Sequence, residues 1–264
     1  MARCRPDYNS AMSSITLLAL DTSTEFCSVA VYRHDPAGRM PALMVERHLD
    51  TGPVSSTHIL PAARDVLREA GVTLAECDAI GFGAGPGSFT GLRTACGVAQ
   101  GLAFGAGLPV VPVGTLLACA EAARALRVDA RRVLVALDAR MNEAYWADYT
   151  WDTDAGDWRE VQAPSLDAPE HVRAPDTDFV VAGNAVTAFG ERLQAGLQAQ
   201  AVLADAMPRA RYVATLAARA FARGEAIPAD RAMPVYVRNK VAQTTAERDA
   251  IRQAASHGPG KEAP

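Results

Sequence analysis

A glycine-rich stretch at residues 82–94, FGAGPGSFTGLRT, limits the folds open to this chain more than any other feature. It follows an apolar run typical of a buried strand and precedes an alanine-rich run with helical spacing, so it predicts a strand–loop–helix unit. Glycines let the main chain approach a ligand, and the N–H groups that open a helix attract anions. No lysine follows the last glycine, and the spacing does not match GxGxxG. We therefore expect an anion-cradling loop that binds by shape rather than one that transfers phosphate.

The composition is that of a globular protein able to bury a large core. The chain has 264 residues, of which 49% are hydrophobic and 21% charged, and its formal net charge is -4. Tight nonspecific binding to nucleic acid depends on clustered Lys and Arg, so any contact with RNA is expected to need a partner. The five cysteines are scattered and form no CxxC pair, which favours free thiols in a reducing compartment. We find no membrane-spanning run and no secretion signal, and we expect a cytoplasmic protein without membrane contact.

Strand-like and helical runs alternate along the chain in two similar blocks. Each block opens with an apolar strand that ends in an aspartate, Asp21 in the first and Asp138 in the second. This pattern predicts an α/β protein of two lobes, built from mixed sheets flanked by helices, with both carboxylates facing a cleft between the lobes.

The same pattern predicts the limits of the lobes. We expect the first lobe over residues 15–113 and the second over 114–242, with the last helix, near 208–222, packed back on the first lobe. Residues 234–238 are expected to form a short edge strand. Tails over 1–14 and 243–264 are expected to be disordered, because they are polar and rich in small residues.

Four motifs follow one another in a fixed order along the chain. They are LALDTS at 18–23, GAGPGSFTGLR at 83–93, DAR at 138–140 with YWA at 145–147, and PVYVR at 234–238. Together they resemble the TsaB (YeaZ) family over about residues 15–248. The resemblance implies the actin-like, sugar-kinase-like (ASKHA) two-lobed fold. It also implies a role in making N6-threonylcarbamoyladenosine (t6A) at position 37 of tRNAs that read ANN codons.

The resemblance further implies partners. In that pathway the related subunit TsaD transfers the threonylcarbamoyl group to tRNA, and the P-loop ATPase TsaE takes part. A chain of this family is expected to be a non-catalytic subunit that binds and activates TsaD through its first lobe, with TsaE at the junction. It reaches tRNA only within the complex, and alone it can pair with a second copy of itself.

TsaD holds its metal with a His-x-x-x-His pair just after the strand that follows the glycine-rich loop and its helix. At the matching positions this chain has Thr115 and Cys119. A hydroxyl and a thiol with no third ligand make a poor metal site. We therefore expect a threonine hydroxyl bonded to the backbone, a buried thiol, no metal and no catalytic residue.

A nucleotide site is a further hypothesis that the resemblance raises. Asp21 to Ser23 resemble the first phosphate motif of the actin-like fold, but the second motif, normally Asp-Gly-Gly, here has side chains after Asp138. Arg140 is a candidate to grip an anion directly. We expect no resident cofactor and only weak ATP or ADP binding. The residues expected at this cleft are Asp21, Thr22, Ser23, Gly85, Gly87, Ser88, Asp138 and Arg140.

Two helices, expected near 57–70 and 94–104, are the predicted docking surface. In the TsaB family the equivalent pair packs against TsaD or against a second copy, and small side chains on the second helix suit close approach. The alternative is that the helices only cover their own sheet, and both interpretations can hold. The candidate contact residues are His58, Leu60, Ala63, Leu67, Arg93, Ala95, Gly97, Val98, Gly101 and Leu102.

Two other functions stay open from the sequence. A small-molecule kinase or ATPase of the actin-like fold would turn over ATP with Mg²⁺ and would need Asp21. A metallopeptidase of the glycoprotease type would need a bound metal, and the hydroxyl of Thr115 and the thiol of Cys119 make a poor set of metal ligands.

Overall fold

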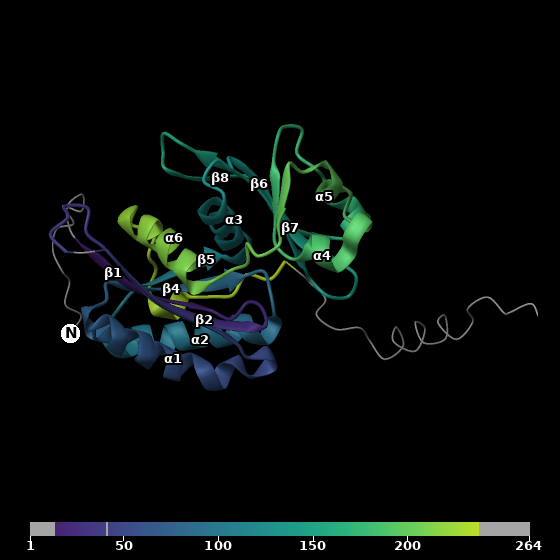
Figure 1. The fold of residues 1–264 in the computed structure, drawn as a ribbon. Helices are drawn as coiled ribbons and strands as arrows, with labels where there is room; N and C mark the ends of the chain where they lie inside the picture. Colours follow the sequence, from purple (N-terminus) through teal and green to yellow (C-terminus); the bar gives the residue numbers. More distant parts are fainter. Residues whose placement is uncertain (1–13, 41, 238–264) are drawn as a thin grey trace, which may run out of the picture.

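The structure of the protein is a computed structural model that describes residues 14–40 and 42–237 (Figure 1). The tails predicted over 1–14 and 243–264 lie outside the described residues, apart from Ser14. Arg238, the last residue of the predicted edge strand, also lies outside them.

The first sheet has five strands, in the order β3-β2-β1-β4-β5. They are β1 (Ile15–Asp21), β2 (Phe26–His34), β3 (Leu43–Asp50), β4 (Ala79–Gly85) and β5 (Val110–Gly114). β2 is antiparallel to β1 and β3, whereas β1, β4 and β5 run parallel. Every residue of β1 is buried, because helices cover both faces of this sheet.

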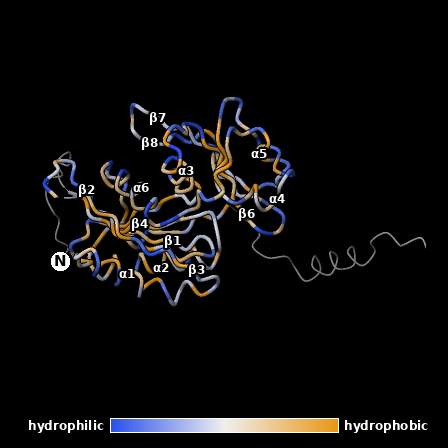
Figure 2. Tube along the Cα trace, viewed as in Figure 1, coloured by the Kyte–Doolittle hydropathy of each residue, from blue (hydrophilic) through white to orange (hydrophobic). Residues whose placement is uncertain are grey.

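The helices on the two faces come from distant parts of the chain. α1 (Ser55–Ala70) and α2 (Phe89–Ala106) lie side by side on one face, packed on Leu18 and Leu20. α6 (Ala210–Ala222) covers the other face and packs on Leu17 and Ala19 (Figure 1). The strands in the middle of this sandwich consist largely of hydrophobic residues, which Figure 2 colours orange along the Cα trace.

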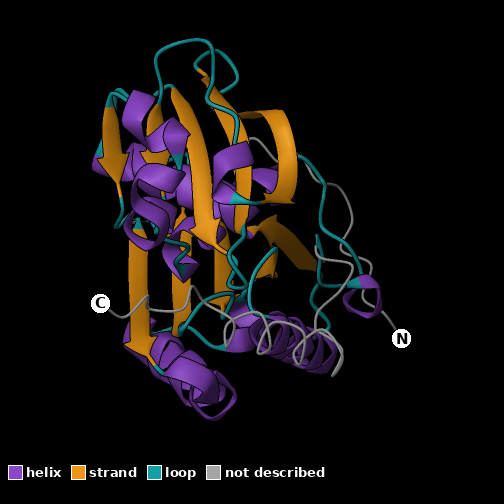
Figure 3. Cartoon of the chain, turned by 90° about the vertical axis from the view of Figure 1, so that its right-hand side faces the viewer, coloured by secondary structure: helices purple, strands orange, loops and turns teal. Residues whose placement is uncertain are grey.

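The second sheet repeats the first. Its strands are β6 (Arg132–Asp138), β7 (Ala144–Asp152), β8 (Asp157–Asp167), β9 (Val180–Ala182) and β10 (Ala201–Leu203). Their order, β8-β7-β6-β9-β10, and their directions match β3-β2-β1-β4-β5 strand for strand. α3 (Thr115–Leu126) covers one face, and the short α4 (Ala185–Phe189) and α5 (Gln194–Gln198) cover the other. This arrangement, with strands between helices (Figure 3), confirms the predicted two-lobed α/β fold with mixed sheets.

Two predicted elements differ from the structure. The second docking helix begins at Phe89 rather than near residue 94, because Ser88 is its N-cap and its hydroxyl accepts a hydrogen bond from the Gly91 N–H. Residues 234–237 form no strand. They run extended beside the end of β4 and make one ladder-like bond, from the Val235 N–H to the Ala84 carbonyl at 2.7 Å.

A buried carboxylate joins α6 to the second sheet. Glu121 of α3 is 9% exposed and accepts hydrogen bonds from the Arg219 guanidinium at 2.6 and 3.1 Å and from the Trp158 indole N–H at 2.7 Å. Arg219 belongs to α6 and Trp158 to β8, so the cluster joins three elements.

We predict that Arg219→Ala lowers the free energy of unfolding by ~2 kcal/mol. The substitution leaves Glu121 buried without its counter-ion, and the partial exposure of Arg219 moderates the cost. Arg223→Ala, which removes the more exposed pairs to Asp157 and Glu225, is the matched control and is expected to cost less than ~1 kcal/mol. Urea denaturation of both variants measures the difference, and equal losses would contradict the role given to Glu121.

Candidate functional site

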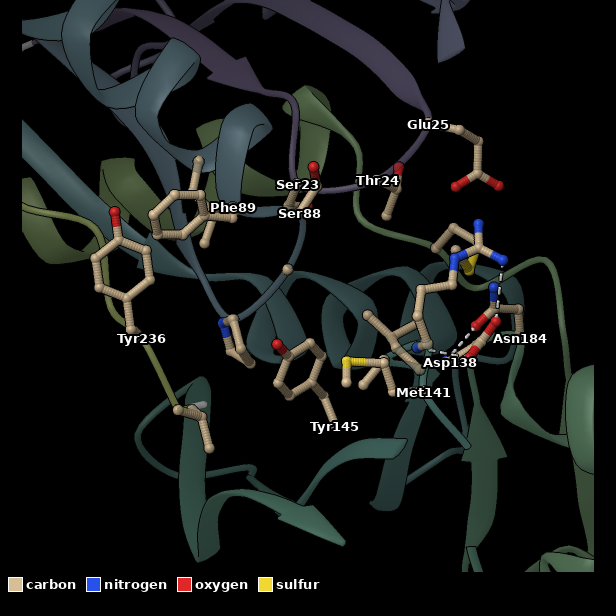
Figure 4. A pocket seen from close by; sticks show the side chains of 18 of the residues that line it. Ser23, Thr24, Glu25, Ser88, Phe89, Asp138, Met141, Tyr145, Asn184 and Tyr236 are labelled. Carbon is tan, nitrogen blue, oxygen red and sulfur yellow. Dashed lines mark hydrogen bonds and ion pairs between the residues drawn. The ribbon is translucent and has the colours of Figure 1, made fainter. Parts of the chain in front are cut away.

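A cleft of 540 Å³ opens where the parallel strands of both sheets end. Its walls follow β1 at Ser23, β4 at Ser88, β6 at Asp138 and β9 at Asn184. Figure 4 shows Phe89 and Tyr236 on one side of the cleft and Asp138 and Asn184 on the opposite side. Crevices at the carboxyl ends of parallel strands are the usual binding places of α/β proteins.

The structure brings only part of the predicted set to this cleft. The lining residues include Ser23, Gly87, Ser88, Asp138 and Arg140. Asp21 and Thr22 do not line it, because they are 1% and 0% exposed. Gly85 lies behind residue 235, whose carbonyl oxygen would be 2.4 Å from an added Cβ.

The polar side chains of the turn after β1 form hydrogen bonds within the chain. Asp21 Oδ1 accepts hydrogen bonds from the Ser23 N–H at 3.1 Å and the Ser23 hydroxyl at 2.8 Å. The Thr22 hydroxyl donates to the Gly91 carbonyl at 2.7 Å. Asp21 Oδ2 is buried and has no hydrogen-bond partner in the described part of the chain. Burial raises the pKa of Asp21 to about 6, although the hydrogen bonds from Ser23 oppose the shift.

The glycines of the loop accommodate this turn. A Cβ on Gly91 would lie 1.8 Å from the Thr22 carbonyl oxygen, one on Gly83 1.9 Å from Asp21 Oδ2, and one on Gly87 2.5 Å from the Ser23 carbonyl oxygen. The Ser88 N–H also donates to that Ser23 oxygen at 2.8 Å. The close backbone approach that the glycines allow is therefore made to the chain's own β1 turn, and not to an anion as the sequence suggested.

The opposite side of the cleft is a strained turn. Arg140, Met141 and Asn142 have φ values of 63°, 54° and 64°. Such values are uncommon outside glycine and are concentrated at functional sites. Asp138 supports the turn, since its Oδ1 accepts from the Arg140 N–H at 2.8 Å and its Oδ2 from the guanidinium at 3.3 Å.

These residues do not fit the phosphates of a nucleotide. The hydroxyls of Thr22 and Ser23 and the N–H of Ser88 are engaged within the chain. Arg140 is paired with Asp138. Among residues 14–40 and 42–237, the charged side chains that line the cleft are Glu25, Asp138 and Arg140, which together carry one excess negative charge. An anionic ligand would meet repulsion there, so we assign no chemistry through a nucleotide.

Several lining residues were missed from the sequence. They are aromatic or sulfur-containing, and they give the cleft its apolar wall: Phe89, Tyr145, Tyr236, Met141 and Met207. Tyr145 and Tyr236 belong to two of the four sequence motifs, but periodicity alone does not show that these two residues face one cavity.

The two positions that the family resemblance places opposite a metal-binding histidine pair are buried. Thr115 and Cys119 are both 0% exposed. The expected backbone hydrogen bond of Thr115 was wrong, since its Oγ1 has no partner among the described residues. Burial holds the pKa of the Cys119 thiol well above its usual range, so the thiol stays protonated, which disfavours metal binding. Within residues 14–40 and 42–237 no group of three or more His, Cys, Asp or Glu could hold a metal ion.

The predicted docking residues divide between two faces of α1 and α2. Ala63 and Ala95 point into the core, at 3% and 0% exposure, so they are not available to a partner. His58, Leu60, Arg93, Gly97 and Gly101 are exposed, and Leu67, Val98 and Leu102 are half-buried. Phe104, which was not among the predicted contact residues, lies on α2 with 84% of its surface exposed. The outer face of this helix pair thus combines exposed apolar side chains with glycines.

We predict that Asp21→Asn flattens the pH dependence of stability between pH 4 and 6. The folded state holds the Asp21 proton more tightly than the unfolded chain does, because the pKa rises from 3.8 to about 6 on folding. The stabilising contribution is complete below pH 3.8 and is lost as the pH rises through about 6, a difference of roughly 3 kcal/mol. Asn keeps an oxygen for Ser23 and cannot ionise, so the variant is expected to be more stable than wild type at pH 7.5.

Denaturant titrations of both proteins from pH 4 to 8 measure this effect. Asp154→Asn, at an exposed position, is the control and is expected to follow wild type. Parallel pH curves for wild type and Asp21→Asn would contradict the burial argument.

No helix in the described part of the chain is long and apolar enough to cross a membrane.

Comparison with known proteins identifies relatives of the whole domain. The family model described as TsaD, tRNA N6-adenosine threonylcarbamoyltransferase, matches residues 50–246. The tRNA threonylcarbamoyladenosine biosynthesis protein TsaB of Haemophilus influenzae is 38% identical over 87% of this chain and 96% of its own length. TsaB of Escherichia coli is 38% identical over 86% of this chain and 96% of its own length. The solved structure of YeaZ from Pseudomonas aeruginosa is 40% identical, covers 84% of this chain and 99% of its own, and superposes with a TM-score of 0.75. The chain therefore belongs to the TsaB (YeaZ) family of tRNA threonylcarbamoyladenosine biosynthesis proteins.

Proposed function

We propose that this protein is a non-catalytic subunit in the synthesis of N6-threonylcarbamoyladenosine at position 37 of tRNAs that read ANN codons. It acts by docking on TsaD through the outer face of α1 and α2 and by stabilising the active arrangement of that enzyme. A ligand that shifts a partner's population must bind the active state more tightly than the inactive one. The docking face is therefore expected to fit the active form of TsaD.

The observation that carries this proposal is the outer face of α1 and α2. Leu60 and Phe104 expose 51% and 84% of their surfaces, and nothing within 4 Å would meet a Cβ on Gly97 or Gly101. Glycine in a helix interior costs ~0.5–1 kcal/mol relative to alanine, so the fold itself gains nothing from these two residues. Their benefit is expected at an interface, where the absence of a side chain lets a second helix approach closely.

The chemistry of the cleft supports a role without catalysis. Asp21, the residue that a kinase of this fold would need, is buried away from the cleft and keeps a raised pKa. The positions that match the metal ligands of TsaD hold a buried hydroxyl and a protonated thiol. Neither the kinase nor the metallopeptidase hypothesis gains a supporting observation.

We further propose that TsaE joins the complex at the junction of the two proteins, and that tRNA is bound only by the assembly. The net charge of -4 supports the second point, because it does not favour an independent contact with RNA. In the absence of TsaD, the same face of α1 and α2 is expected to pair with a second copy of this chain.

Reconstitution with TsaD and TsaE from the same organism tests the function. Purified TsaD, TsaE, threonylcarbamoyl adenylate and unmodified tRNA are mixed with and without this protein, and t6A is quantified by mass spectrometry of digested tRNA. Product is expected only in the complete mixture. Formation of t6A at an unchanged rate when this protein is omitted would refute the proposal.

A further inference from the structure

One exposed row on α2 has two ends of different chemistry. Arg93, Gly97, Gly101 and Phe104 are all exposed, and their spacing of four, four and three residues places them on one side of the helix. The row is about 16 Å long, since an α-helix rises 1.5 Å per residue. A cation lies at one end, an aromatic ring at the other, and the two glycines lie between them. The row can therefore distinguish the two directions in which a partner helix could lie.

Two contacts hold the Arg93 side chain in place. Its Nε donates to the Tyr236 hydroxyl at 3.0 Å, and its guanidinium carbon lies 3.8 Å from the centre of the Phe89 ring. The Phe89 and Tyr236 rings lie next to each other, with centroids 5.4 Å apart (Figure 4). An arginine that is already ordered loses less conformational entropy when it binds a second group. The structure thus prepares Arg93 for a contact outside this chain.

The charge of Arg93 has no carboxylate partner among the described residues. Arg93 is the only charged residue of α2. The two carboxylates of the neighbouring helix α1 pair elsewhere, Asp65 with Arg68 at 2.9 Å and Glu69 with Arg47. The hydroxyl bond engages only Nε, so neither terminal nitrogen of the guanidinium has a hydrogen-bond partner in the described part of the chain.

Docking through this row would cover the guanidinium together with the glycines. A charge that is removed from water without an opposite charge is costly, so a partner that covers Arg93 has to supply the missing carboxylate. Arginine binds a carboxylate through two parallel hydrogen bonds, which its two terminal nitrogens are free to donate.

We propose that Arg93 is the charged anchor of the docking face and binds an Asp or Glu side chain on the TsaD helix that packs on Gly97 and Gly101. The ion pair sets the direction of the partner helix, with its apolar end at Phe104. This inference rests on the proposed docking of α2 on TsaD, and it adds the chemistry that the partner surface needs.

Isothermal titration calorimetry with TsaD tests the charge. Arg93→Gln keeps an amide donor for the Tyr236 hydroxyl and is expected to weaken binding ~30-fold, whereas Arg93→Glu places two acids together and is expected to weaken it at least ~300-fold. Denaturant titration is expected to show that both variants stay folded. Arg131→Glu reverses an exposed charge on the second lobe and is the matched control, with wild-type affinity. Equal losses for Arg93→Gln and Arg93→Glu, or no loss for either, would overturn the proposal.

Cross-linking identifies the carboxylate directly. The chain has only two lysines, Lys240 and Lys261, so Arg93→Lys adds a single amine to α2. A water-soluble carbodiimide, which takes up the water released, joins an amine and a carboxylate in direct contact as an amide. Peptide mass spectrometry of the Arg93→Lys complex, formed at saturating concentrations, is expected to find position 93 linked to one Asp or Glu of TsaD. The control Arg131→Lys is expected to give no link to TsaD from position 131.

The outcomes separate this inference from the proposed function. Wild-type protein that does not bind TsaD would refute docking itself. An intact complex in which position 93 gives no link to TsaD, or links scattered over many acids, would refute the anchor alone. Docking through α1 and α2 would then still stand.

Discussion

Gly91→Ala is expected to destabilise the protein by more than ~4 kcal/mol, or to prevent folding at 37 °C. The added Cβ would lie 1.8 Å from the Thr22 carbonyl oxygen, and that neighbour is backbone, which cannot rotate away. Relief would require α2 to move away from the β1 turn. Such a movement would break the Thr22 hydroxyl bond to Gly91 and the Ser88 N–H bond to Ser23.

Gly97→Ala is the matched control on the same helix. A Cβ there meets nothing within 4 Å, so the substitution is expected to raise stability by ~0.5–1 kcal/mol through the better helix propensity of alanine. Chemical denaturation of wild type and both variants measures the free energy of unfolding, which is expected to fall for Gly91→Ala and to rise for Gly97→Ala. A Gly91→Ala protein as stable as wild type would show that the loop does not pack on the β1 turn as described.

The double variant Gly97→Leu with Gly101→Leu is expected to weaken binding to TsaD by at least 100-fold while the protein stays folded. Both glycines lie on the exposed side of α2, and an added Cβ at either position would meet nothing within 4 Å. Across a close helix–helix contact the same two side chains would keep the partner's backbone at a distance. The loss corresponds to about 2.7 kcal/mol of binding free energy, a typical cost when a well-packed interface is disrupted.

Isothermal titration calorimetry with purified TsaD measures this change. Gln198→Leu adds the same apolar side chain at an exposed position on α5 and is expected to bind like wild type. If the α2 variant binds TsaD with unaltered affinity, the docking face lies elsewhere on the molecule.

The two-lobed fold could be predicted from the sequence because the patterns that indicate it are local and occur twice. Apolar strands ending at Asp21 and Asp138 opened two blocks of the same pattern, and the two sheets have the same strand order. The start of α2 was misplaced, because Gly91 resembles a helix breaker in the sequence. In the structure Gly91 is a helical residue, and the β1 turn leaves no space for a side chain at this position.

The role of the glycine-rich loop could not be predicted, since a glycine pattern shows that a backbone approaches closely but not what it approaches. Small residues posed the same difficulty on the docking helices. Ala95 and Gly97 are two positions apart, yet one faces the core and the other faces outward. The wall of the cleft was missed because Phe89, Tyr145 and Tyr236 are far apart in the chain and meet only when both lobes are assembled.

Light scattering coupled to size-exclusion chromatography tests most directly that this protein works by docking. The chain and TsaD are measured separately and as an equimolar mixture. The same mixture is then measured with the Gly97→Leu, Gly101→Leu variant in place of the wild-type chain. The mixture is expected to give a single peak with the mass of a one-to-one complex, and the variant mixture to give separate peaks. Two separate peaks for the wild-type mixture, at concentrations well above micromolar, would contradict a role in binding and activating TsaD.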